Sequence, residues 1–322
     1  MLKRLCKILL IIIIIHPDCF GQDIDPGPGY QMIMMNNPAL SGSEGAGILR
    51  LSYLNFYPGN NYNLHSGYIS YDSYFPVLHG GAGFYLTDDY MGGIINDLKG
   101  GFSYSYFLRA GRDLFINAGL SGSFYHRGYN FDKAILPDQI DPAGGVSIPP
   151  AELLTNTGRT IFDMGAGVIF ISGKIFGGFS VNHLAEPDLS STASLNEVLK
   201  RKLLVHLIGD FNLSRTGNLK IRPQVYTGLQ KGYFSAGAGA SLESNYLSVN
   251  TILLYDNVGN LNVQTGFAFK SGRMSIYYNY RFNLVSENSM YPFSLLHQTG
   301  LSFSLTEVDK RNAIKTIILP KL

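Results

Sequence analysis

Two consecutive stretches of alternating side chains constrain the fold of this chain more than any other feature. Apolar and polar residues alternate strictly over residues 261–270 and 273–284, and Ser271-Gly272 links the two stretches. Period-2 alternation places one set of side chains on each face of a β-strand, and a short glycine-containing link predicts a hairpin. These strands reach about ten residues, whereas strands of soluble proteins usually have about five or six. A strand of about 9–11 residues fits a tilted crossing of a lipid bilayer.

The first residues are typical of a secretory signal peptide. Basic residues within 1–7 precede an apolar run, Ile8–Ile15, and a small-residue cleavage site ends at Gly21. This run is too short for a membrane anchor, because a spanning helix needs about 20 apolar residues. A lipoprotein signal at Cys19 is less favoured, since His-Pro-Asp before it lacks the small and apolar residues that lipidation usually needs. We therefore predict a cleaved signal at residues 1–21.

Composition after signal cleavage favours an outer-membrane barrel over a secreted β-sandwich. Both cysteines, Cys6 and Cys19, leave with the signal, so no disulfide or thiolate metal site is expected. Cleavage lowers Lys+Arg from 25 to 22 and Asp+Glu from 23 to 22, and this balance argues against a nucleic-acid binder. Charged residues are only 15% of the sequence, against about 25% in an ordinary soluble domain, while Gly, Tyr and Phe are abundant.

We predict an all-β transmembrane barrel of about fourteen antiparallel strands over residues 48–306. The predicted strands are 48–57, 64–75, 78–88, 97–110, 113–128, 159–171, 174–184, 202–214, 218–230, 232–243, 246–255, 260–270, 273–284 and 295–305. The lead-in, residues 22–47, lacks periodicity, and we expect an ordered segment that plugs or lines the lumen. In the tail, residues 307–322, four apolar side chains either dock on a partner or on the rim of the barrel, or the terminus is poorly ordered. These four are Ile314, Ile317, Ile318 and Leu319.

The lengths of the connections support an even number of strands and predict an orientation. All even-numbered connections are short, namely 76–77, 111–112, 172–173, 215–217, 244–245 and 271–272. The long connections are all odd-numbered, namely 89–96, 129–158, 185–201 and 285–294. Outer-membrane barrels have short periplasmic turns and longer surface loops. We therefore predict that both termini are periplasmic, whereas a sandwich has no reason to sort its loops in this way.

The alternation in the hairpin also predicts which side chains face lipid. The apolar and aromatic set should face lipid: Leu261, Val263, Phe267, Phe269, Met274, Ile276, Tyr278, Tyr280, Phe282 and Leu284. The polar set should face the lumen: Asn262, Gln264, Lys270, Asn279, Arg281 and Asn283.

Patterns typical of catalysis or metal binding are weak. The histidines that follow the signal lack the i, i+4 spacing of a helical zinc pair, and Ser, His and a polar residue do not converge as a lipase requires. Acidic residues cluster in loops, at 88–89 and within 132–141, where solvated carboxylates are favoured over bound calcium. We expect no enzyme activity, no cofactor and no metal ion. The four prolines of the 129–158 loop make it a stiffened candidate contact surface.

Five segments carry a resemblance to a known family. Three of them carry short motifs: Asn-Pro-Ala-Leu-Ser-Gly within residues 30–42, His-Gly-Gly-Ala-Gly within 70–88, and Gly-Phe-Ser-Val-Asn-His-Leu within 176–187. The fourth, residues 219–223, ends in a mid-strand proline, and the fifth, residues 297–303, belongs to the predicted closing strand. In order and spacing they resemble the PorP/SprF membrane proteins of the type IX secretion and gliding machinery. The matching residues, to which we assign structural roles, are Asn37, Pro38, Gly42, Asp72, Gly80, Gly81, Gly83, Gly178, Ser180, His183, Leu184, Pro187 and Pro223.

One motif departs from the family pattern, and one proline is difficult to place. The family often has Arg-x-Gln-Trp in its first strand, where this chain reads Leu51–Pro58 and contains no Trp. Whatever that motif contributes is therefore absent or altered here. Pro223 would remove a ladder hydrogen bond from the middle of a strand unless it lies at a bulge.

The resemblance implies an outer-membrane protein that helps to export large adhesin-like cargo or to hold it at the cell surface. Cargo would bind the loops 129–158 and 185–201, and periplasmic secretion and motility proteins would meet the termini. Lipid of the outer membrane is the other expected partner, and nucleic acid is not one. The alternative is a passive channel for a small apolar solute, because fourteen strands lie between small filled barrels and wide porins.

Overall fold

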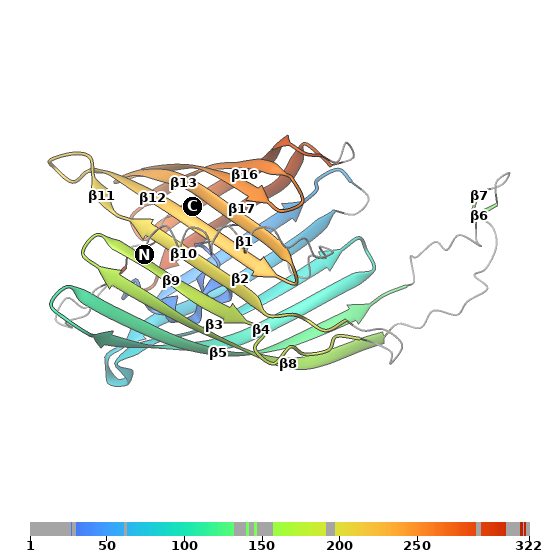
Figure 1. The fold of residues 1–322 in the computed structure, drawn as a ribbon, viewed down its shortest axis with the longest axis horizontal. Coiled ribbons are helices and arrows are strands. Elements are labelled where there is room, and N and C mark those ends of the chain that lie inside the picture. The colour runs from blue at the N-terminus through green and yellow to red at the C-terminus, as the bar shows by residue number, and fades with distance from the viewer. Residues whose placement is uncertain are drawn as a thin grey trace, which may run out of the picture.

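The hydrogen-bonded sheet of this protein closes on itself and forms a barrel of fourteen antiparallel strands (Figure 1). The computed structural model describes residues 27, 30–60, 63–131, 140–141, 145–146, 157–190, 197–287, 291–306, 316–317 and 319. The predicted signal at 1–21 and most of the 129–158 loop lie outside the described residues. Within them, no helix is long and apolar enough to cross a membrane.

The strands follow the predicted ranges closely. They are β1 (Ile48–Phe56), β2 (Leu64–Phe75), β3 (Gly80–Met91), β4 (Ile95–Arg109), β5 (Leu114–Tyr129), β8 (Thr157–Ser172), β9 (Ile175–Asn182), β10 (Lys202–Gly209), β12 (Leu219–Gln230), β13 (Tyr233–Ser244), β14 (Leu247–Asp256), β15 (Leu261–Ser271), β16 (Met274–Val285) and β17 (Ser294–Ser304). β11 (Phe211–Asn212) prolongs β10, while β6 (Ile140–Asp141) and β7 (Gly145–Val146) form a separate small sheet. The prediction of fourteen antiparallel strands is confirmed.

One predicted strand begins later than expected. The third strand was placed at 78–88 but spans Gly80–Met91, because Pro76–Leu78 form a short 3-10 helix, η2. His79 ends this turn in the left-handed conformation, with φ of 49°. A proline at the first helical position favours such a turn, which uses residues that would otherwise begin the strand.

The barrel closes through its first and last strands. β1 pairs with β17 from Ile48 opposite Ser304 to Phe56 opposite Leu296. The start of β1 and the end of β17 therefore lie at the same end of the barrel, which we call the terminal mouth. All even-numbered connections are short and lie at this end, while the long connections after β5 and β9 lie at the opposite end, which we call the loop mouth. The loop mouth also holds the short turns 92–94 and 231–232. The predicted long connection 89–96 is thus wrong, because β3 and β4 extend into it.

Pro223 lies at a break in the ladder and not at a bulge. The pairing of β12 with β13 continues through Pro223 opposite Ala240. On its other side, β12 pairs with β10 up to Ile208 opposite Gln224, and then with β11 from Phe211 opposite Ile221. The register is the same on both sides of this gap. Because proline has no N–H to donate, the interruption that separates β10 from β11 lies where that donor is missing.

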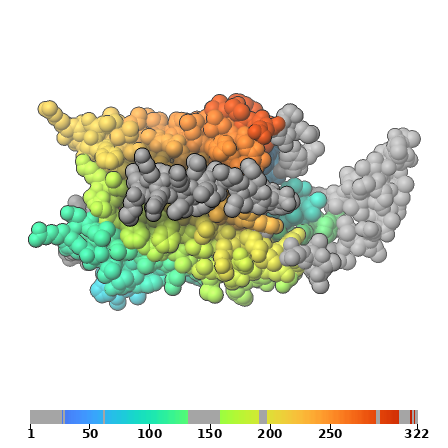
Figure 2. Space-filling model, in the orientation of Figure 1, coloured from blue at the N-terminus to red at the C-terminus, as the bar shows by residue number. Residues whose placement is uncertain are grey.

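The two faces of the β15–β16 hairpin agree with the alternation. Phe267 and Phe269 are 52% and 53% exposed on the outer face, whereas Gln264 and Asn279 are only 2% and 1% exposed. Lys270, beside the turn at the terminal mouth, is the exposed member of the set assigned to the lumen. In the space-filling view, side chains of neighbouring strands pack into one elongated wall (Figure 2).

Phe267→Arg should lower the free energy of unfolding by about 2–4 kcal/mol, because its guanidinium would lie in hydrocarbon. Phe267→Leu, which stays apolar, should change it by less than about 1.5 kcal/mol. Urea unfolding in lipid vesicles measures both variants. Equal stability of the two would show that Phe267 does not face lipid.

Candidate functional site

The segment that precedes β1 lies inside the barrel (Figure 1). It contains a short helix, α2 (Ile33–Asn36), and a 3-10 turn, η1 (Pro38–Leu40), and we call residues 30–47 the plug. Its turn packs against the inner faces of β4, β5 and β8, while α2 contacts β3. Most of its side chains are buried. The plug, which has no alternating strand pattern, is therefore enclosed by the barrel wall.

The Asn-Pro pair folds the plug locally and anchors it to the wall. The Asn37 side-chain oxygen accepts a hydrogen bond from the Ala39 N–H at 3.0 Å, and Pro38 begins the 3-10 turn. The Asn37 amide nitrogen donates to the carbonyl oxygen of Phe179 in β9 at 3.2 Å. Asn37 is fully buried, so both contacts replace water that the side chain lost on folding.

Glycines in the wall make room for the backbone of the plug. A Cβ atom at Gly119 of β5 would lie 2.3 Å from the Ala39 nitrogen, and one at Gly167 of β8 would lie 2.0 Å from the Asn37 side-chain oxygen. A Cβ at Gly81 of β3 would lie 1.9 Å from the Ser41 carbonyl oxygen. We call these three residues the glycine seat. Any larger side chain there would force the plug away from the wall.

Serine side chains of the wall complete the hydrogen bonds of the plug. Ser105 of β4 donates to the Ala39 carbonyl oxygen at 2.9 Å, and the hydroxyls of Ser103 and Ser41 are 2.5 Å apart. In β9, the Ser180 hydroxyl donates to the Asn36 carbonyl oxygen. Carbonyl groups that a short helix leaves unpaired thus find partners in the barrel.

A buried ion pair holds the end of the plug beside β1 and β2. The Gly42 N–H donates to the Asp72 carboxylate at 2.7 Å, and Arg50 is paired with the same carboxylate. Arg50 also lies 3.1 Å from the Glu44 carboxylate of the plug. Gly42 has φ of +68°, a conformation that favours glycine. Because Arg50 and Asp72 are almost fully buried, removal of Arg50 would leave the Asp72 carboxylate without a cation, whereas removal of Asp72 would leave Arg50 paired with Glu44 alone.

The remaining family-motif residues are spread over the wall and the loop mouth. Gly80 and Gly178 allow close contact between strands, since a Cβ would lie 2.0 Å from the Ser105 oxygen and 2.2 Å from the Val168 oxygen respectively. Gly83 lies beside Asp72 and Met34, while His183, Leu184 and Pro187 lie where β9 ends and its loop begins. Seven of the family-motif residues belong to the plug or contact it: Asn37, Pro38, Gly42, Asp72, Gly81, Gly83 and Ser180. Five others lie elsewhere in the wall or at the loop mouth: Gly80, Gly178, Leu184, Pro187 and Pro223.

The connection after β9 folds against the inner wall at the loop mouth. Leu189 and Leu199 are buried against Tyr125 and Ile161. The Leu199 N–H donates to the Pro187 carbonyl oxygen at 2.9 Å. Within this connection, hydrogen bonds from Ser190 hold the pKa of Asp188 below its usual range. The described part of the 185–201 loop is therefore ordered by its own contacts.

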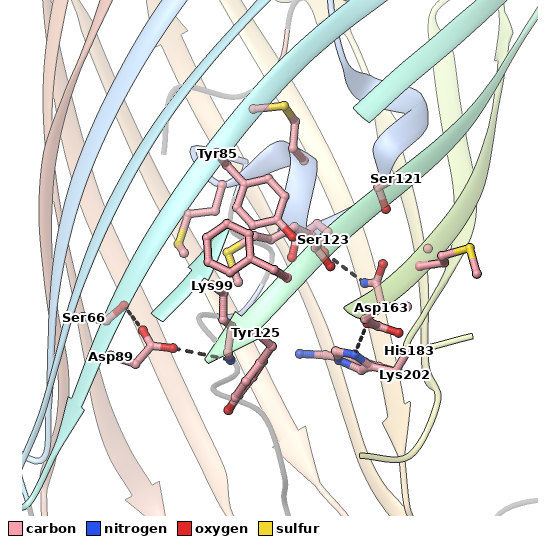
Figure 3. A pocket seen from close by; sticks show the side chains of 18 of the residues that line it. Ser66, Tyr85, Asp89, Lys99, Ser121, Ser123, Tyr125, Asp163, His183 and Lys202 are labelled. Carbon is pink, nitrogen blue, oxygen red and sulfur yellow. Dashed lines mark hydrogen bonds and ion pairs between the residues drawn. The ribbon is translucent and has the colours of Figure 1, made fainter. Parts of the chain in front are cut away.

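A small chamber of about 70 Å³ separates the plug from the loop mouth (Figure 3). Methionines 32, 34 and 35 of the plug form one side, and charged side chains of the wall form another. Asp89 lies 3.4 Å from Lys99, and the His183 Nδ1 atom lies 2.7 Å from the Asp163 carboxylate. Among the described residues, no group of His, Cys, Asp and Glu has the geometry to hold a metal ion. The Ser66 hydroxyl donates to the Asp89 carboxylate at 2.5 Å, so these polar contacts occupy one another on one side of a chamber whose other side is apolar.

Sequence reasoning missed Gly119, Gly167, Ser103, Ser105 and Arg50. All five belong to the inward-facing set of their strands, so alternation could have indicated their orientation. No local pattern shows that the plug lies against them. Their partners in the plug are between 6 and 130 positions away along the chain, by residue number.

Comparisons with known proteins agree with this fold. A family model described as type IX secretion system membrane protein PorP/SprF matches residues 30–295. Curated protein sequences give no significant match. The solved monoaromatic hydrocarbon channel CymD is 12% identical, with 90% of this chain and 96% of that chain covered and a TM-score of 0.52. This likeness supports the barrel fold alone.

Two further solved structures share the general shape at lower TM-scores. The toluene transporter TodX of Pseudomonas putida is 12% identical, with 83% of this chain and 90% of that chain covered and a TM-score of 0.48. The outer membrane protein Omp33 of Acinetobacter baumannii is 9% identical, with coverages of 82% and 99% and a TM-score of 0.45. The family match and the closed fourteen-strand wall together identify an outer-membrane β-barrel.

Gly119→Ala should destabilise the barrel by about 1–3 kcal/mol, because its methyl group would overlap the plug backbone. Gly122→Ala on the same strand is the matched control, since a Cβ there meets no atom within 4 Å. Urea midpoints of both variants in detergent test the glycine seat. If both variants unfold at the same urea concentration, Gly119 does not hold the plug.

Arg50→Met should lower the free energy of unfolding by about 3–5 kcal/mol, because it leaves the Asp72 carboxylate buried without its cation. The double variant Arg50→Met with Asp72→Asn removes both charges and should recover part of this loss. The same urea measurement applies. A double variant less stable than the single one would contradict a role of the ion pair.

Proposed function

The chain belongs to the PorP/SprF family of type IX secretion system membrane proteins, and we propose that it serves this system as a plugged, non-enzymatic barrel. Its task would be to help export large adhesin-like proteins or to retain them at the cell surface, and so to support gliding in motile cells. The observation that carries this proposal, beyond the family itself, is the plug that the inner wall is built to hold. A lumen filled in this way fits a docking component better than an open pore.

We propose that the terminal mouth faces the periplasm and the loop mouth faces the outside. The sorting of connections supports this orientation, since bacterial barrels carry short turns on the periplasmic side. Periplasmic secretion and motility proteins would then meet the plug and the tail. Cargo would meet the loops 129–158 and 185–201, which are the longest connections at the loop mouth. A signal at residues 1–21 would direct export of the chain.

The alternative, a passive channel for a small apolar solute, has less support. CymD is named for monoaromatic hydrocarbons, but at 12% identity it carries no ligand over to this chain. The inner face of β12, β14, β16 and β17 buries four amide side chains, Gln224, Asn250, Asn279 and Gln298, beside apolar residues such as Ile252 and Leu254. Amide side chains suit water and hydrogen-bonding groups and not an aromatic hydrocarbon. Uptake of toluene by reconstituted vesicles would favour the alternative.

Replacement of residues 138–150 by a Gly-Ser linker of equal length should release cargo into the medium, because the proline-rich contact surface is lost. Immunoblots of cells and medium measure the cargo, and heat-modifiable mobility shows that the barrel is folded. An equal-length replacement within 185–201 tests the second loop. Cargo that stays on the surface in both variants would contradict the loop assignment. Copurification of a large surface protein with the intact barrel supports the secretion role independently.

A further inference from the structure

The described end of the tail returns into the terminal mouth of the barrel. Ile317 and Leu319 are only 3% and 1% exposed. They belong to the same apolar cluster as Tyr30, Ile33 and Leu40 of the plug. The wall closes this cluster with Ile171 and Phe176, which lie next to the short turn between β8 and β9 at the terminal mouth. The tail therefore packs on the plug from the side on which the chain ends.

Two hydrogen bonds fix the tail in this position. The Ile317 N–H donates to the carbonyl oxygen of Ser43 in the plug at 2.8 Å. The Arg222 guanidinium of β12 donates to the Leu319 carbonyl oxygen at 3.3 Å. Arg222 is itself fully buried and held 2.5 Å from the Glu243 carboxylate, so its direction is fixed. The tail thus connects the plug to the wall opposite the glycine seat.

The end of the plug and the start of the segment that leads to the tail are hydrogen-bonded to each other. The Gly47 N–H donates to the Thr306 hydroxyl at 2.6 Å, and the Leu305 N–H donates to the Gly47 carbonyl oxygen at 2.8 Å. Gly47 ends the plug, and Thr306 begins the segment that leads to the tail. The tail lies beyond the family-matched residues 30–295, whereas the residues that it contacts, such as Ser43 and Arg222, lie within them.

We propose that Ile317 and Leu319 form a latch that keeps the plug seated, and that their groove is a docking site for a short apolar peptide. In the resting barrel the tail of the same chain occupies this groove. The groove is formed by the cluster residues of the plug and of β8 and β9, with Arg222 as the donor for a peptide carbonyl group. Removal of the tail uncovers the plug on the side that opens to the terminal mouth, while the glycine seat still holds its other side.

A cysteine in the plug reports the latch directly, because residues 22–322 contain no other cysteine. Met32→Cys suits this purpose, since Met32 is buried in a separate cluster with Leu54 and Leu296 that does not include the described tail residues Ile317 and Leu319. In the intact barrel this thiol should react slowly with a maleimide probe. Ile317→Asp with Leu319→Asp should raise the labelling rate by about tenfold or more, because two buried side chains leave the cluster.

The controls separate release of the plug from loss of the fold. Thr316→Asp, between the barrel and the latch, should label at the unmodified rate because Thr316 is only partly buried. Heat-modifiable mobility checks each barrel, and Ile317→Ala with Leu319→Ala replaces the Asp pair if that pair does not fold. Equal labelling of the latch variants and of Thr316→Asp would overturn the latch.

A peptide added in trans tests the docking site without any substitution in the groove. A chain that ends at Thr306 should label quickly at Met32→Cys, and a peptide of residues 312–322 should slow labelling again. The same peptide with Asp at 317 and 319 should have no effect. Failure of the native peptide to bind or to protect would overturn the docking site. Both measurements follow the plug itself, so their outcome is independent of the secretion role.

Discussion

Every backbone N–H and C=O group of a strand that faces lipid needs a partner within the protein, because the bilayer core offers no water. This protein meets the requirement by pairing β1 with β17 and β10 with β12, so that the sheet has no edge. Closure requires an even number of antiparallel strands and brings both ends of the wall to one mouth. The one proline within the described ladder, Pro223, lies where the strand opposite β12 is interrupted.

The inside of the wall holds the plug through three kinds of contact. Glycines of β3, β5 and β8 admit the plug backbone, serines of β4 and β9 accept or donate hydrogen bonds to it, and Asp72 accepts the Gly42 N–H. The opposite half of the wall carries buried amides such as Asn250, whose side chain has no hydrogen-bond partner among the described residues. The described contacts that hold residues 30–47 are therefore concentrated on β2, β3, β4, β5, β8 and β9.

Sequence patterns were sufficient for the wall and insufficient for its contents. Alternation and the parity of loop lengths led to fourteen strands, because both are local consequences of one face in lipid and one in the lumen. The glycine seat could not be found in this way. Alternation separates the inward-facing Gly119 from the outward-facing Gly122 of β5, but no local pattern shows that the plug lies against Gly119. That contact depends on distant segments, as does the return of Ile317 and Leu319 into the mouth.

The seam between β1 and β17 has a consequence for the order of assembly. Neighbouring hairpins can form independently, but this seam joins Ile48 to Ser304 and has the longest intervening chain of any pairing in the barrel. The conformational entropy lost on closing a loop grows with loop length, so this pairing is expected to form last. The plug precedes β1 and lies within the ring, so a wall that closes last can wrap around a plug already lying on β3, β4 and β5. A ring that closed early would instead have to be threaded from one end.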